Sequence, residues 1–266
     1  MSKIPALIFL LLIPSVTLAA PSPHLLPYWI TENPNSVQTL SHQQWQTFLN
    51  KYLVSSEDQQ LVHYQQVDDA DKMSLTLYTK MLANVDPRKL NRTEQMAYWI
   101  NLYNALTVIT ILNHYPVESI LDIRSSFFSP GPWKKEIINI SGFWLSLNDI
   151  EHRILRPIFK DPRVHYALNC ASIGCPNLNP QAFTGQNLNE LLEQSAHDFI
   201  NSDKGLFLDD IEARLSKIYD WYRRDFGDTK EGLMIHFNEY LEKKLTINQL
   251  GNIEYQYDWT LNEAFK

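Results

Sequence analysis

The sequence predicts an α+β protein, a helix-rich single domain with a long buried central helix and a small β-sheet. Two observations lead to this class. Residues 93–114 are apolar on nearly every side of a helix, which is typical of a helix at the centre of a domain. Residues 164–169 form a short apolar run between Pro162 and a stretch of small residues, which favours a strand.

The composition narrows the function classes. Hydrophobic residues make up 44% of the chain and aromatic residues 12%, so we expect a globular protein with a substantial core. The net charge of −7 and the lack of a dense basic run argue against a nucleic-acid surface. Neither GxGxxG nor GxxxxGK[ST] occurs, so we expect no phosphate loop and no cofactor.

The first 19 residues resemble a secretory signal peptide. Lys3 gives a short positive start, an apolar run follows, and small residues lead to a cleavage position after Ala19. No later segment has the roughly 20 apolar residues that a spanning helix needs. We therefore expect a periplasmic or secreted protein whose mature chain does not span a membrane.

The remaining chain divides into three parts. Residues 20–85 read as an extended and helical lead-in, with helices from Ser41 and over residues 73–82. Residues 86–228 form the core domain, in which helices are expected at 188–200 and 217–226. Residues 229–266 supply a last helix and an aromatic tail packed on the core, with residues 255–259 docking as a strand.

The long central helix carries unexpected polar residues. Asn101 and Asn104 lie on one stripe of a helix that is otherwise apolar. Buried amides need hydrogen-bond partners. Either they fix neighbouring loop backbone, or they line a polar site that binds a substrate.

A second helix, predicted over residues 147–159, buries a charge. Ser146 is expected to cap it with Asp149 as the capping-box partner. On a helical wheel Glu151 falls inside the apolar face and His152 lies at its edge. A buried carboxylate must be protonated or paired. Arg156, or a histidine elsewhere, is the expected partner, and Arg156 is also a candidate substrate-binding residue.

Both cysteines lie in one turn, at Cys170 and Cys175. They could form one disulfide, although closing so small a loop is sterically demanding. In an extended strand His165 and Cys170 would face opposite sides, since they are an odd number of residues apart. His152 is therefore the better candidate base for a Cys170 nucleophile.

Four segments resemble the signatures of the domain-of-unknown-function family 547. They read AYWINLYNALT at 97–107, LSLNDIEH with ILR at 145–156, DPRVHYALNC to CP at 161–176, and WY with DFG at 221–227. They follow the family's order and span about residues 90–228. The resemblance implies an exported bacterial member and supplies no reaction.

Three function classes can use these residues. In the first, Cys170 attacks a carbonyl, His152 or His165 takes its proton, and Glu151 or an asparagine orients the imidazole, giving hydrolysis or acyl transfer. The expected substrate is small and peptide-like or derived from cell-wall material. In the second, the protein is a non-catalytic binding or scaffold module whose cysteines form a disulfide or stay buried. In the third, the cysteines and a histidine bind zinc, although we expect no metal. The sequence does not identify a protein partner.

Overall fold

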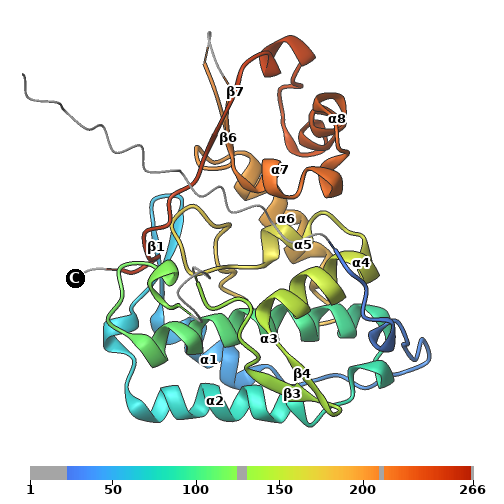
Figure 1. Cartoon of the computed structure of the whole chain (residues 1–266), viewed down its shortest axis with the longest axis vertical. Coiled ribbons are helices and arrows are strands. Elements are labelled where there is room, and N and C mark those ends of the chain that lie inside the picture. The colour runs from blue at the N-terminus through green and yellow to red at the C-terminus, as the bar shows by residue number, and fades with distance from the viewer. Residues whose placement is uncertain (1–22, 125–130, 210–212, 265–266) are drawn as a thin grey trace, which may run out of the picture.

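The computed structural model describes residues 23–124, 131–209 and 213–264 (Figure 1). Within these ranges helices dominate and the strands form small sheets, so the predicted helix-rich α+β class is confirmed. The expected signal peptide, residues 1–19, lies outside the described residues, which begin at residue 23 within the lead-in.

The α-helices differ greatly in length. They are α1 (Gln43–Tyr52), α2 (Asp69–Ala83), α3 (Arg92–His114), α4 (Arg156–Phe159), α5 (Val164–Ala167), α6 (Leu188–Ile200), α7 (Ile218–Trp221) and α8 (Lys230–Tyr240). Short 3-10 turns link them: η1 (Pro27–Trp29), η2 (Tyr64–Gln66), η3 (Pro87–Lys89), η4 (Ile120–Asp122), η6 (Arg223–Phe226) and η7 (Ile247–Leu250). A π-helical segment, η5 (Asp149–Leu155), precedes α4.

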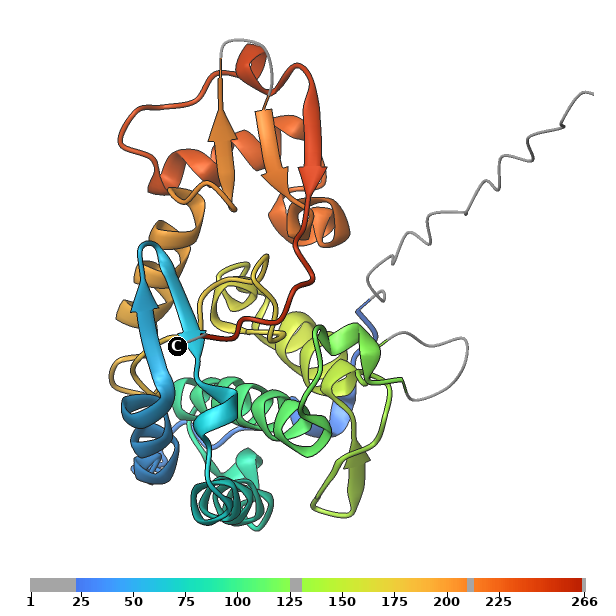
Figure 2. The same ribbon diagram turned by 90° about the vertical axis from the view of Figure 1, so that its left-hand side faces the viewer.

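Helix α3 is the buried helix that the sequence predicts. The side chain of Asn91 caps its start by accepting the backbone N–H of Glu94 at 3.0 Å. Nearly all of its residues are buried. Figures 1 and 2 show α3 crossing the lower part of the molecule, with α2 below it and the π-helical segment against it.

The strands form three small sheets in the described ranges. Two are antiparallel hairpins, β1 (Leu53–Ser56) with β2 (Gln59–Val62) and β3 (Ile138–Ile140) with β4 (Phe143–Leu145). The third has the order β5 (Leu206–Leu208), β6 (Ala213–Ser216), β7 (Ile253–Gln256). In it β7 runs parallel to β6, so the C-terminal tail adds an edge strand.

Two hydrophobic clusters fill the molecule. The larger surrounds α3, and the smaller lies between α7, α8 and the β5–β6–β7 sheet. Figure 2 shows the smaller cluster's elements as an upper lobe above the α3 region. Helix α6 joins the two, because Leu188 and Leu192 belong to the larger cluster and Phe199 and Ile200 to the smaller.

The strand predicted over residues 164–169 is wrong. Residues Val164–Ala167 are the short helix α5 instead. The carbonyl oxygens of Asp161 and Pro162 accept the N–H groups of Val164 and His165, both at 3.2 Å. These hydrogen bonds begin a helical turn, although the branched and aromatic residues of this segment favour a strand.

The helix predicted over residues 147–159 also differs. Ser146 and Asp149 form the expected reciprocal cap, with the Ser146 N–H donating to Asp149 Oδ2 at 2.9 Å. The backbone hydrogen bonds of the π-helical segment η5 then have i→i+5 spacing, and the chain continues as α4. The backbone N–H groups of His24 and Leu26 donate to the carbonyls of His152 and Arg153, so the lead-in segment runs along η5.

Candidate functional site

A cluster of buried and half-buried polar side chains joins the two lobes. We call it the junction cluster; its members are Glu151, His152, Arg156, His165, Tyr222 and Asp225. The first three come from η5 and α4, His165 comes from α5, and the last two come from the segment around η6. Because burying ionisable groups is costly unless they are paired, such a cluster is a candidate functional site.

Glu151 is buried, with 6% of its surface exposed, as the helical wheel predicts. The hydroxyl of Tyr103 donates to its Oε2 at 3.0 Å, and Tyr222 lies near the carboxylate. Burial alone would raise the pKa of Glu151, but nearby His152 and His165, with Tyr222 and Arg156, outweigh it and lower that pKa. Glu151 is therefore a buried, ionised carboxylate.

Asp225 connects the two lobes through one oxygen atom. Its Oδ2 accepts Nε–H of Arg156 at 2.6 Å and lies 2.7 Å from Nε2 of His165. The ring of Tyr222 completes this arrangement, since it stacks on His165 at 4.0 Å and lies beneath the Arg156 guanidinium at 4.7 Å. Although burial would raise the pKa of Asp225, the His165 and Arg156 hydrogen bonds hold it well below its usual range.

His152 contacts both Arg156 and Glu151. Its Nδ1 lies 3.2 Å from Nη1 of Arg156, and because a guanidinium only donates, this nitrogen accepts. The carboxylate of Glu151 is 3.7 Å from the same nitrogen, too far for a hydrogen bond. Burial is the first cause of the lowered pKa of His152.

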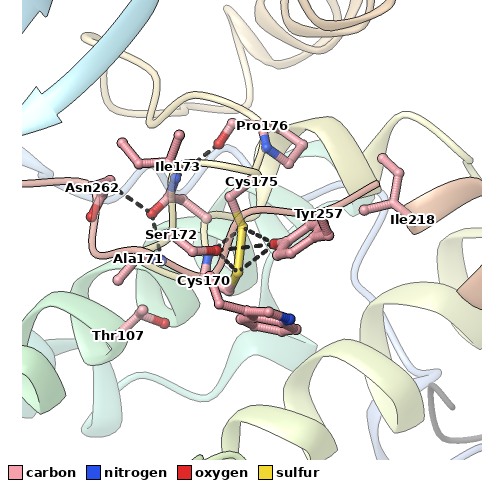
Figure 3. Close-up of a disulfide and its surroundings, with 12 residues drawn as sticks. Thr107, Cys170, Ala171, Ser172, Ile173, Cys175, Pro176, Ile218, Tyr257 and Asn262 are labelled. Atoms are coloured by element: carbon pink, nitrogen blue, oxygen red, sulfur yellow. Dashed lines mark hydrogen bonds between the residues drawn. A yellow bond between two sulfur atoms is a disulfide. The ribbon is translucent and has the colours of Figure 1, made fainter. Parts of the chain in front are cut away.

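The two cysteines form a disulfide beside the C-terminal tail. Cys175 is buried, whereas Cys170 is partly exposed. Figure 3 shows the hydroxyl of Tyr257 pointing at both sulfur atoms, and its oxygen lies 2.9 Å from Sγ of Cys170 and 3.1 Å from Sγ of Cys175. The hydroxyl of Ser172 lies 3.1 Å from Sγ of Cys170 and 3.1 Å from the Tyr257 oxygen.

The tail is held to the disulfide loop by backbone hydrogen bonds. The N–H of Ile173 donates to Thr260 at 2.8 Å, and that of Gly174 to Asp258 at 2.9 Å. The close approach needs glycine, because an added Cβ at Gly174 would lie 2.7 Å from the Asp258 nitrogen. The loop therefore fixes where Tyr257 and its neighbours lie.

A pocket of about 360 Å³ opens where the disulfide loop meets the C-terminal tail. Its lining comes from the disulfide loop, the turn before β5, strand β6 and the tail: Ile173, Gly174, Asp203, Lys204, Arg214, Leu215, Gln256, Tyr257, Asp258 and Trp259. Lys204 donates to Asn177 at 2.8 Å, and burial lowers its pKa to about 8. The pocket thus combines aromatic rings with side chains of both charges.

The predicted site residues lie in separate parts of the structure. Asn101 bonds both the N–H and the carbonyl of Phe183, and Asn104 bonds the N–H of Asn169 and the carbonyl of Ala167. Glu151, His152, Arg156 and His165 meet in the junction cluster. Cys170 lies in the disulfide instead, where its sulfur contacts the two hydroxyls.

Sequence reasoning missed four residues that matter here. Tyr222 and Asp225 complete the junction cluster, and Tyr257 and Lys204 border the pocket. The resemblance at WY and DFG was the available signal for the first two. In the described parts of the chain, no group of three or more His, Cys, Asp or Glu side chains is arranged to hold a metal ion.

These features define a helix-rich α+β domain with a polar junction and a disulfide-bordered pocket. Residues 87–200 match the model of the family described as "Protein of unknown function, DUF547", which supports the resemblance seen in the sequence. No curated protein and no solved structure matches the chain. None of the described helices combines the length and apolar character required for crossing a membrane.

Proposed function

We propose that this protein is a binding module, in which the disulfide shapes the wall of the pocket beside Tyr257. One observation carries the proposal: the Tyr257 hydroxyl contacts both sulfur atoms while the same residue lines the pocket. The disulfide therefore orients a pocket residue. Small-molecule sites have volumes of roughly 300–1,000 Å³, so a cavity of about 360 Å³ suits a small ligand.

The hydrogen bonds of the histidines favour binding over thiol catalysis. A base must lie within hydrogen-bond reach of the proton it removes, about 3 Å or one bridging water. His152 contacts Arg156, and His165 contacts Asp225. The hydrogen-bonding side chains around Sγ of Cys170 are the hydroxyls of Ser172 and Tyr257. A hydroxyl whose own pKa is raised by burial, as that of Tyr257 is, makes a poor base for a thiol.

A thiol-dependent hydrolase or acyl transferase acting on peptide or amide bonds is the second candidate. It is favoured by the partial exposure of Cys170 and by its two hydroxyl neighbours, which would donate to a thiolate. An external dithiol would have to reduce the disulfide first, giving two protein thiols and its own disulfide. Cys170 would then be the nucleophile.

The state of the thiols and the turnover separate the two candidates. Native protein is treated with iodoacetamide, with and without prior reduction by a phosphine, and its intact mass is measured. Hydrolysis of p-nitrophenyl acetate is followed in both states. A binding module gains two alkyl groups only after reduction and shows no turnover in either state. Turnover in the reduced protein that Cys170→Ser abolishes and Cys175→Ser retains would establish the second candidate.

The N-terminal residues are the basis for proposing the compartment in which the protein acts. We propose that residues 1–19 direct export and that the mature chain acts in the periplasm or outside the cell. That compartment maintains disulfides, in keeping with a structural Cys170–Cys175 bond. The full-length chain expressed in a bacterial host should be recovered from the exported fraction with Ala20 as its first residue. Recovery of uncleaved protein in the cytoplasm would contradict export.

A further inference from the structure

We propose that the pocket beside the disulfide binds a small neutral saccharide, a mono- or disaccharide, against the rings of Tyr257 and Trp259. This rests on the proposed binding function and names its ligand class. The chemical character of the pocket lining carries the argument.

The aromatic side of the pocket is large and fixed. The rings of Tyr257 and Trp259 lie 4.6 Å apart, and Trp221 packs on both, at 4.8 and 5.6 Å. Trp133 also packs against Trp259, with 5.7 Å between the ring centroids. The face of an aromatic ring carries negative potential. It therefore attracts the polarised C–H groups on one face of a sugar ring.

The polar side of the pocket suits hydroxyl groups. Each sugar hydroxyl both donates and accepts, so it needs partners of both kinds. Among the lining residues, Asp203 and Asp258 carry acceptor groups, Lys204 and Arg214 carry donor groups, and Gln256 carries both. Unpaired polar groups in a pocket weaken binding, so a purely apolar ligand fits this lining poorly.

The balance of charge favours a neutral ligand. The two carboxylates and the two cationic side chains of the lining have opposite signs and equal number. Lys204 also has two protein acceptors, Asn177 Oδ1 at 2.8 Å and the Ile173 carbonyl at 3.4 Å. A phosphate or other anion would meet two carboxylates. The volume of about 360 Å³ lies near the lower end for small-molecule sites, which limits the ligand to one or two sugar rings.

The test is a titration of intrinsic tryptophan fluorescence, repeated by calorimetry, with the full mature chain. The probes are cellobiose and N,N′-diacetylchitobiose, and alanyl-alanine serves as the peptide probe. We expect saturable binding of at least one disaccharide. Trp259→Ala should weaken it by about tenfold or more, the loss of one aromatic contact of about 1.4 kcal/mol. Trp144→Ala is the matched control, because Trp144 is 60% exposed on β4 and does not line the pocket.

A second variant covers the case in which Trp259→Ala does not fold. Asp258→Asn keeps an oxygen for the N–H of Thr260, a bond of 2.8 Å, but removes a charge from the lining. It should weaken disaccharide binding several-fold. Absence of binding by both disaccharides, binding of alanyl-alanine alone, or unchanged affinity in Asp258→Asn would overturn the saccharide proposal. None of these results changes the outcome of the thiol alkylation and turnover assays. A failure of the saccharide proposal can therefore be told apart from a failure of the proposed binding function.

Discussion

Oδ2 of Asp225 lies 2.6 Å from Nε of Arg156, across 69 positions of sequence. The same oxygen lies 2.7 Å from Nε2 of His165. Arg156 belongs to α4 beside the larger hydrophobic cluster, and Asp225 belongs to η6 beside the smaller one. The ion pair therefore couples the two lobes.

Asp225→Asn should destabilise the protein. The substitution keeps the shape of the side chain but removes the charge facing the buried Arg156. Losing one partner of a buried ion pair costs about 3–5 kcal/mol, and we expect about 3 because Asp225 is partly exposed. Urea unfolding measures the loss. The control is Asp220→Asn, whose surface pair with Arg223 contributes under about 1 kcal/mol. Equal effects of the two substitutions would disprove the coupling.

Glu151→Ala should also cost about 3–5 kcal/mol in the free energy of unfolding. It removes the acceptor of Tyr103 and the carboxylate near His152 and Arg156. Glu151→Gln should cost less, because the amide oxygen still accepts from Tyr103. Glu239→Ala, at an exposed position of α8, is the control and should stay within about 0.5 kcal/mol. A thermal melt of Glu151→Ala that matches the wild type would show that the carboxylate is not paired in solution.

The parts of the fold that depend on local pattern could be predicted. The apolar residues of α3 and the Ser146–Asp149 cap lie close together in sequence, and both are present. The burial of Glu151 followed from its place among apolar neighbours. Helix α5 could not be predicted from pattern, because the hydrogen bonds of the turn at Asp161 outweigh the strand preference of residues 164–169.

The site depends on contacts distant in sequence. No spacing rule connects Arg156 or His165 to Asp225, or Cys170 to Tyr257, 87 positions later. The tail reaches the disulfide loop because β7 pairs with β6. Single-sequence reasoning could therefore propose Glu151, His152 and His165 as one group, but it could not find Asp225, which joins His165 to Arg156.

Stability should fall as the pH drops from about 6.5 to about 4. Burial lowers the pKa of both His42 and His236 from 6.5 to about 4 in the folded protein. In that window the unfolded chain binds these protons and the folded chain does not, so acid favours unfolding. Each histidine should account for roughly 3 kcal/mol across the window. Urea unfolding at several pH values measures the change.

His236→Gln isolates one contribution. The hydroxyl of Tyr166 lies 2.7 Å from Nε2 of His236, and an amide can replace that contact without titrating. The variant should lose less stability between pH 6.5 and 4 than the wild type does. His197→Gln, at an exposed position of α6, should leave the pH dependence unchanged. If the two variants follow the same curve, His236 titrates normally in the folded state.

Gly174→Ala should loosen the tail from the disulfide loop. An added Cβ would lie 2.7 Å from the nitrogen and 3.0 Å from the oxygen of Asp258, and backbone atoms cannot rotate away as a flexible side chain can. Overpacking of this kind costs about 1–3 kcal/mol. Because the tail holds Tyr257 and Trp259, the variant should melt at a lower temperature and be cleaved sooner by protease within residues 253–264. Gly251→Ala is the control, since its added Cβ meets only the Asn248 carbonyl at 3.2 Å. Equal melting temperatures and cleavage rates for the two variants would mean that the tail adjusts without losing its contact with the loop.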